Sequence, residues 1–114
     1  MKHEVFEGHS SEIKKETPWL SSEDLLGRGD QEVEIVACHR YREVTFDEGR
    51  KEPEIFTLQF KNRKKQLVLN AVNRKTLVRR FGTNVSEWKG KVITLWVDEN
   101  VRFRGQTVCG IRIR

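Results

Sequence analysis

The spacing of apolar residues along the chain predicts mostly extended strands. In the first run the apolar residues occupy odd positions and then even ones; they are Val33, Ile35, Ala37, Val44 and Phe46. A period of two places alternate side chains on one face of a strand, so a change of parity requires an extra residue. The pattern therefore predicts one long strand from residue 32, with a β-bulge or bend between about Cys38 and Glu43.

Four later runs repeat the period of two. Their apolar residues are Phe56, Leu58 and Phe60; Leu67, Leu69 and Ala71; Ile93, Leu95 and Val97; and Cys109, Ile111 and Ile113. Turn-forming residues occupy 47–53 and 62–65, and residues 98–106 form a predicted hairpin loop. These runs predict a three-stranded meander and, later in the chain, a two-stranded hairpin.

The period becomes helical between the third and fourth strands. The apolar face of this helix consists of Leu77, Val78 and Phe81. Asn73 or Thr76 is available as its N-cap, and Gly82 ends it. A second short turn at residues 86–90 brings Trp88 into the core.

A shorter helical turn precedes the first strand. Ser21 caps this turn and Gly27 ends it. Its apolar residues are expected to cover one end of the core; they are Trp19, Leu20, Leu25 and Leu26. Residues 1–16 have no sustained period and are expected to form a flexible acidic tail.

The element order predicts an all-β domain with one helix, spanning residues 17–114. Strand, strand, strand, helix, strand, strand is the order of a five-stranded antiparallel barrel of the oligonucleotide-binding (OB) type, in which the helix plugs one end. A bent first strand lets such a sheet close on itself. The competing prediction is a half-open antiparallel sheet with one packed helix.

Length and composition favour one small domain. A chain of 114 residues with 36% hydrophobic residues can enclose one modest core, which excludes a large multi-substrate enzyme. The sequence has no apolar run long enough to span a membrane and no secretion signal. Cys38 and Cys109, far apart in the sequence, do not suggest a disulfide scaffold. We expect a soluble protein in the cytoplasm, with two inert thiols.

Charge is distributed unevenly along the chain. Residues 1–30 hold four basic and seven acidic residues, whereas residues 31–114 hold 18 basic and 10 acidic ones, a net charge of +8. Residues 55–86 and 100–114 contain no acid at all. This separation favours a polyanionic partner for the basic part. A solvated basic surface is the alternative.

Several segments together resemble a known group of proteins. They are residues 67–76 (LVLNAVNRKT), 81–83 (FGT), 87–95 (EWKGKVITL) and 107–114 (TVCGIRIR), with WLSSEDL at 19–25. In these segments the chain resembles small uncharacterised proteins encoded in bacteriophage and prophage genomes. The resemblance spans residues 19–114 and implies an OB-type barrel in a bacterial host cell, without implying a mechanism.

Catalytic and metal-binding patterns are absent from the sequence. His3 and His9 lie in the tail, while Cys38 and His39 are strand neighbours whose side chains point to opposite faces. The acidic pair at 98–99 has no partner at a motif spacing and is interpreted as part of a turn. There is no glycine-rich phosphate loop and no metal-ligand spacing. We therefore expect no enzyme, no metal and no cofactor.

Binding to a single-stranded nucleic acid has better support. An OB-type barrel binds through its second and third strands and the loops that flank them, using aromatic faces and cations. The candidate nucleic-acid-binding residues are Tyr41, Arg50, Lys51, Thr57, Gln59, Lys61, Asn70, Trp96, Arg102, Phe103 and Arg104. The alternatives are that Phe103 packs on the barrel rim and that the segment around Trp19 covers Trp96.

The sequence therefore predicts a non-catalytic module that binds single-stranded DNA or RNA, serving phage DNA replication or recombination. A phage-encoded protein-interaction or structural module with the same barrel is the alternative, with a phage or host protein as its partner. The acidic tail would then lie over the basic face. A homodimer joined through strand edges is compatible with either prediction.

Overall fold

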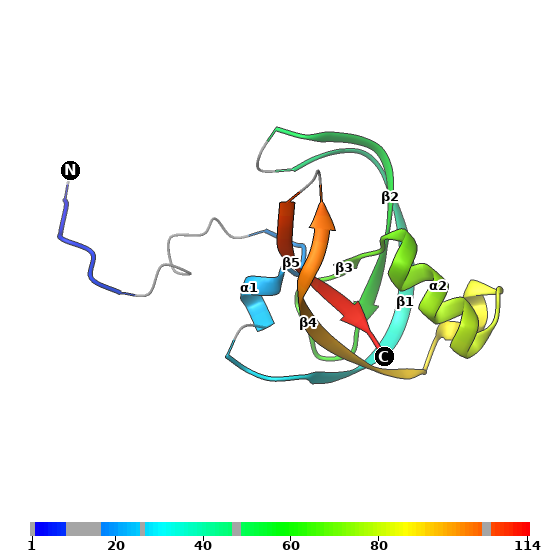
Figure 1. The fold of residues 1–114 in the computed structure, drawn as a ribbon. Coiled ribbons are helices and arrows are strands. Elements are labelled where there is room, and N and C mark those ends of the chain that lie inside the picture. Colours follow the sequence, from blue (N-terminus) through cyan, green and yellow to red (C-terminus); the bar gives the residue numbers. More distant parts are fainter. Residues whose placement is uncertain (1, 9–16, 26, 47–48, 104–105) are drawn as a thin grey trace.

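The fold is that of one open, five-stranded sheet with one main helix (Figure 1). The computed structural model describes residues 2–8, 17–25, 27–46, 49–103 and 106–114, without the side chains of 102–109. Its elements are α1 (Ser22–Leu25), β1 (Gln31–Thr45), β2 (Lys51–Phe60), β3 (Leu67–Val68), α2 (Ala71–Phe81), the 3₁₀ helix η2 (Val85–Trp88), β4 (Val92–Phe103) and β5 (Gln106–Ile113). This order of strands around α2 is the predicted one.

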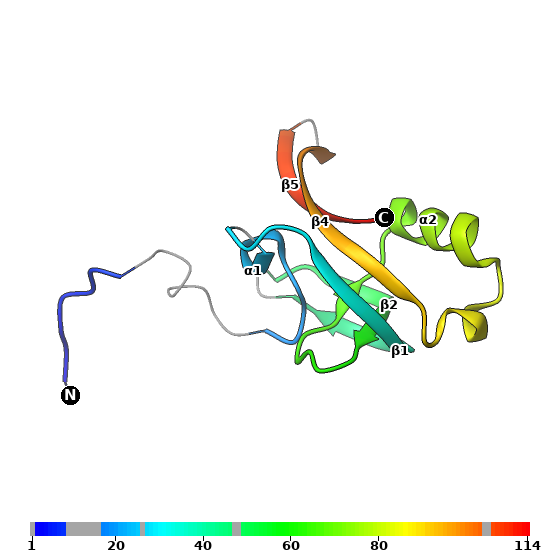
Figure 2. The same ribbon diagram turned by 90° about the horizontal axis from the view of Figure 1, so that it is seen from below.

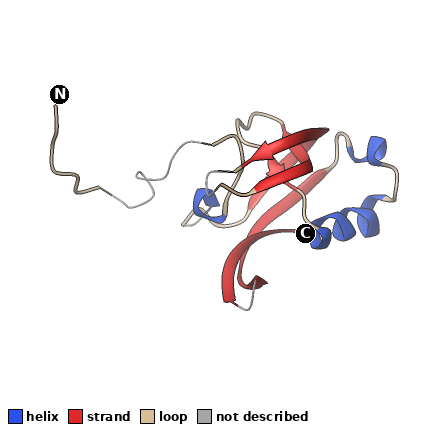
Figure 3. Ribbon diagram, turned by 90° about the horizontal axis from the view of Figure 1, so that it is seen from above, coloured by secondary structure: helices blue, strands red, loops and turns tan. Residues whose placement is uncertain are grey.

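All strand pairs are antiparallel, and the sheet has the order β3-β2-β1-β4-β5. Since β3 and β5 are its two edges, the mostly-β architecture is confirmed, whereas closure into a barrel is not. Figures 2 and 3 show α1 and α2 on opposite sides of the domain, with the β4–β5 hairpin standing apart from β1 and β2. No helix in the described part of the chain is long and apolar enough to cross a membrane.

The predicted bulge in β1 exists, but it lies earlier than expected. The register with β2 shifts between Ile35 and Ala37. Before the shift β1 pairs with β4, and after it with β2, so the bulge marks the corner where β1 changes partner. Val36, Ala37 and Cys38 are three consecutive apolar residues, so the sequence shows no alternation from which the bulge could be located. A second irregularity falls at Glu43, which has a φ of 55°.

The third strand is shorter than predicted, and α2 begins earlier. β3 comprises only Leu67–Val68, and Asn70 is the N-cap of α2. Its side-chain oxygen accepts the backbone N–H of Asn73 at 2.9 Å. An asparagine at this position satisfies a helix N–H that would otherwise have no partner, which explains why the helix begins there. The predictions of Asn73 or Thr76 as N-cap, and of Ala71 in a strand, were wrong.

The hairpin arms are longer than the apolar pattern indicated. β2 begins at Lys51 and includes Pro53, and β4 and β5 occupy most of the predicted loop at 98–106. Asp98, expected in a turn, lies in β4 and faces Arg112 at 3.7 Å. Backbone pairing extends beyond the core here, where no apolar alternation marks the strands.

The core lies between the sheet, α1, α2 and η2. Its buried members are Leu25, Val33, Ile35, Leu58, Phe60, Leu67, Leu77, Trp88, Ile93, Leu95, Ile111 and Ile113. Trp88 is 3% exposed, as predicted, and Leu20 and Leu25 cover one end of the core. Leu26 lies outside the described residues. Phe56 was predicted to face inward with Leu58 and Phe60, but it is 41% exposed. The core covers β2 at Leu58 and Phe60 and does not reach Phe56.

Candidate nucleic-acid interface

One face of the β1–β2 ladder carries the core, and the other carries a group of polar and aromatic side chains. Directly paired residues in an antiparallel ladder point to the same face. Cys38 and Leu58 are paired on the core side. The pairs Ala37–Gln59, His39–Thr57 and Tyr41–Ile55 therefore belong to the opposite face, which we call the outer face.

Four rings form a continuous series, which begins on the outer face and ends at Phe46 after β1, beside Phe56. We call this series the aromatic row; it consists of His39, Tyr41, Trp19 and Phe46. The ring centroids of Trp19 lie 5.3 Å from those of Tyr41 and 6.4 Å from those of Phe46, and His39 lies 6.0 Å from Tyr41. All four residues are partly buried.

Trp19 reaches the row because the N-terminal segment is bonded alongside β3. The backbone N–H of Leu20 donates to the carbonyl of Gln66 at 2.8 Å, and the N–H of Gln66 donates to the carbonyl of Pro18 at 2.9 Å. These bonds form a parallel bridge between Trp19 and Gln66. The indole therefore packs on Tyr41 and Phe46. The segment around Trp19 was predicted to cover Trp96, but the ring contacts described for Trp19 are with these two residues.

The side chain of Gln66 fixes the middle of the outer face. Its Oε1 accepts the hydroxyl of Tyr41 at 3.2 Å and that of Thr57 at 2.6 Å. Thr57 is 0% exposed, so its prediction as a ligand-contacting residue was wrong: its hydroxyl is consumed inside the fold. Gln59 remains partly buried, with its Oε1 2.7 Å from the Nε2 of His39.

Cations lie at both ends of the row. At one end the Arg50 guanidinium lies over the Phe46 ring, 4.3 Å from its centroid, and it also faces Glu52 at 3.3 Å. Lys51 follows it and is exposed. At the other end Lys61 is exposed, two residues beyond Gln59 on β2. At a rise of about 3.3 Å per residue, the ten residue steps from Lys51 to Lys61 span roughly 33 Å, enough for several nucleotides of an extended strand.

The remaining predicted site residues lie elsewhere. Asn70 caps α2 and lines a pocket on the core side of the sheet. Trp96 lies on β4 with the Arg114 guanidinium 5.0 Å from its ring, and no ring contact joins it to the row in the described part of the chain. Arg102 and Phe103 end β4 next to the hairpin tip. Their side chains, and all of Arg104, lie outside the described residues.

The structure thus brings together Tyr41, Arg50, Lys51, Gln59 and Lys61, and it adds four residues that the sequence did not indicate. These four are Trp19, His39, Phe46 and Gln66. His39 has the same strand parity as Tyr41, which was a usable signal. No local sequence pattern predicts the bridge between Trp19 and Gln66, because the bridge joins segments that are far apart in the sequence.

No group of metal-ligating side chains occurs in the described residues. Within the described ranges, no three His, Cys, Asp or Glu side chains lie together as metal ligands would. Comparison with protein-family models, with curated proteins and with solved structures found no match for this chain.

Proposed function

We propose that this chain is a non-catalytic module that binds single-stranded DNA or RNA, built on an OB-type fold. The strand order with α2 inserted between β3 and β4 supports this fold. In OB-type folds, ligands lie across the outer surface of the strands beside the loop between the first two strands. The aromatic row lies beside that loop, with His39 and Tyr41 on β1 and Gln59 next to them on β2.

The observation that carries the proposal is the aromatic row with cations at its two ends. Proteins that bind single strands without sequence preference combine a cationic path for phosphates with rings on which bases stack. Trp19, Tyr41 and Phe46 supply the rings, and Arg50 and Lys61 supply charge at the two ends. His39 and Gln59 add polar groups that suit base edges.

The biological setting we propose is phage DNA replication or recombination in a bacterial host. It rests on the resemblance of residues 19–114 to phage and prophage proteins. The +8 charge of residues 31–114 is compatible with it, since a basic surface draws a polyanion by long-range attraction.

Titration of a labelled single-stranded oligonucleotide at several salt concentrations tests the proposed function. If Arg50, Lys51 and Lys61 each neutralise one phosphate, the logarithm of the affinity should fall with the logarithm of salt concentration with a slope of about −2. A duplex of the same sequence should bind more weakly, because its paired bases cannot stack on the row. Absence of binding at low salt, or equal binding of the duplex, would contradict the proposal.

A second function is favoured by the edge of β2. β3 pairs only with Thr57 and Leu58, and the N–H of Leu69 donates to the Phe56 carbonyl, so in the described strands residues 51–55 of β2 have no further strand beside them. An unpaired edge accepts a strand from another protein. Pro53 and the charged residues around it weaken such pairing, which is why we rank a protein-interaction module second.

A further inference from the structure

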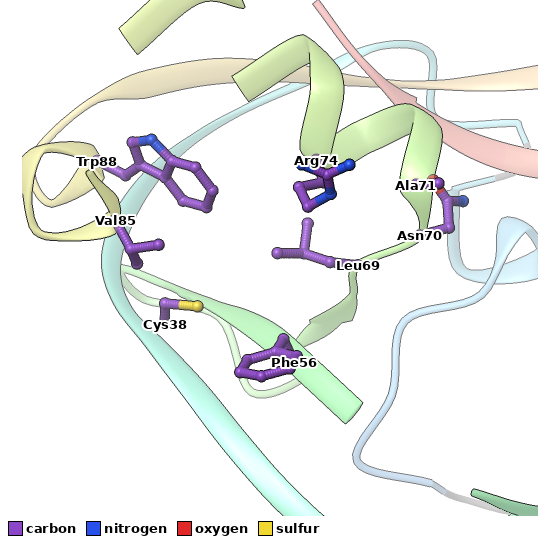
Figure 4. A pocket seen from close by; sticks show the side chains of 8 residues that line it. All are labelled: Cys38, Phe56, Leu69, Asn70, Ala71, Arg74, Val85 and Trp88. Carbon is purple, nitrogen blue, oxygen red and sulfur yellow. The ribbon is translucent and has the colours of Figure 1, made fainter. Parts of the chain in front are cut away.

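A pocket of about 420 Å³ opens on the core side of the sheet, where β1 and β2 meet α2 and η2. Its lining residues are Cys38, Phe56, Leu69, Asn70, Ala71, Arg74, Val85 and Trp88. Figure 4 shows Trp88, Val85 and Cys38 along one side of the hollow and Leu69 and Arg74 along the other. Cys38 lies on the core face of β1, whereas His39 and Tyr41 of the aromatic row lie on the outer face. At the hairpin end, Phe46 lines a second hollow that shares Phe56 and Leu69 with the pocket, so this end of the row lies beside it.

The walls of the pocket are apolar. The Trp88 indole N–H donates to the carbonyl of Gly82 at 3.0 Å, so the ring needs no further polar partner. Burial raises the pKa of the Cys38 thiol, which keeps it neutral near pH 7. Phe56 and Val85 are 41% and 44% exposed, which are high values for such large apolar side chains. A ligand in the pocket would remove both of them from water.

The polar groups at the pocket are hydrogen-bond donors. Arg74 is exposed, and no acidic partner for it occurs in the part of the chain that the structure describes. The side-chain oxygen of Asn70 is occupied by the N–H of Asn73, which leaves its amide N–H groups as donors. The Arg40 guanidinium lies 5.4 Å from the centroid of the Phe56 ring. This combination suits an acidic group.

The carboxylates of the same hairpin are already neutralised. Glu54 lies 3.9 Å from the Arg40 guanidinium and 3.7 Å from that of Arg42. Glu52 faces Arg50 at 3.3 Å. An anion at Arg74 would therefore meet no uncompensated negative charge from these two residues.

We propose that this pocket binds a small amphipathic anion, with its apolar body between Phe56, Val85 and Trp88 and its acidic group at Arg74. Pockets of this size bury small ligands mainly by apolar contact, and a few polar groups fix their orientation. Both an aromatic acid and a medium-chain fatty acid have this chemistry. The proposal does not depend on nucleic-acid binding, because the lining of the pocket includes no residue of the aromatic row.

Two probes test the pocket on the full chain: anilinonaphthalene sulfonate, followed by its fluorescence, and decanoate, followed by displacement of that dye. Arg74→Gln should weaken binding of the dye about tenfold, the value of a charge-assisted hydrogen bond. Arg79→Gln removes the same charge from the same helix outside the pocket and should leave binding within about twofold. Equal effects of the two variants, or no saturable binding of either probe, would overturn the proposal.

A second pair of variants tests the apolar wall. Val85→Ser should weaken the dye several-fold, whereas Val72→Ser, at a valine that is 50% exposed on α2 and outside the lining, should not. Because both valines are exposed, neither change should unfold the chain. Equal weakening by both would contradict the proposed site. Displacement of the dye by decanoate at comparable concentration indicates an acyl ligand, and failure of displacement indicates an aromatic one.

Cys38 reports directly on occupancy. In a Cys109→Ser background it is the sole thiol, and bound dye or decanoate should slow its alkylation at least several-fold. A bound oligonucleotide should not slow it, because Cys38 lies on the face of β1 opposite His39 and Tyr41. Unchanged alkylation at saturating dye would overturn the pocket proposal and leave the nucleic-acid proposal standing.

Discussion

Replacing Trp19 by leucine is expected to weaken the binding of a single-stranded oligonucleotide by roughly tenfold to a hundredfold. Stacking of a base on an aromatic ring contributes about 1–3 kcal/mol, and each 1.4 kcal/mol is a factor of ten in affinity. Trp19 is the central ring of the row, since it contacts both Tyr41 and Phe46. Leucine keeps an apolar side chain against these rings but removes the stacking surface. Fluorescence anisotropy at fixed low salt measures the change.

Trp96→Leu is the matched control. Trp96 is also a partly buried tryptophan with an arginine beside its ring, but it lies on β4 and makes no described contact with the row. Its loss should change the affinity by less than about twofold. If Trp19→Leu loosens the N-terminal segment, Phe46→Leu serves in its place, since Phe46 lies outside the strands and its backbone bonds only Gly49 and Arg50 among the described residues. A larger loss from Trp96→Leu than from either row variant would contradict the proposed interface.

Replacing Asn73 by aspartate is expected to lower the free energy of unfolding by about 3 kcal/mol at pH 7. The Asn73 Nδ2 donates to the carbonyl of Ile111 at 3.0 Å and so joins α2 to β5. The side chain is 1% exposed, and its Oδ1 has no hydrogen-bond partner. A carboxylate cannot donate to Ile111, and an unpaired buried charge is strongly unfavourable. Urea denaturation at constant pH measures the loss.

Asn84→Asp makes the same change at an exposed helix cap. The Asn84 Oδ1 accepts the N–H of Ser86 at 3.1 Å, and a carboxylate accepts that bond equally well. The free energy of unfolding of Asn84→Asp should stay within about 0.5 kcal/mol of that of the unsubstituted chain. Lowering the pH should narrow the difference in free energy of unfolding between the two variants. A protonated carboxyl at position 73 is neutral, and its O–H can again donate to the carbonyl of Ile111. A stable Asn73→Asp protein at pH 7 would contradict the role given to this bond.

The fold was largely predictable because its buried strands carry a clear period. Leu58 and Phe60 on β2, and Ile93 and Leu95 on β4, alternate as half-buried strands do, and all four belong to the core. The helix was detectable from Leu77 and its neighbours. Whether the sheet closes was not readable, because closure depends on pairing between β3 and β5, and β3 has only two residues.

The predicted boundaries were wrong where hydrogen bonds of backbone and polar groups, and not apolar spacing, determine where an element begins or ends. Asn70 begins α2 by capping it, although the apolar run Leu67, Leu69 and Ala71 mimics a strand. Phe56 continues the apolar alternation of β2 but lies beyond the point where the core covers the strand. Apolar spacing reports which face a residue occupies, not whether another layer covers that face.

The candidate site was predictable only where it follows one strand. Gln59 alternates with Leu58 and Phe60 along its strand, and the structure puts it on the outer face, paired with Ala37. Thr57 has the same parity, yet Gln66 covers it through a hydrogen bond between two side chains. Trp19 enters the row through a backbone bridge to Gln66 that leaves no local trace in the sequence.

The central claim is that a single strand lies along the aromatic row, and an NMR titration of the isotope-labelled chain with an oligonucleotide tests it most directly. We expect saturable shifts of the Trp19 indole N–H and of the backbone amides of His39, Tyr41 and Phe46. The amides of α2 (Ala71–Phe81) should remain unchanged. Shifts confined to α2, with the row unaffected at saturation, would contradict the account.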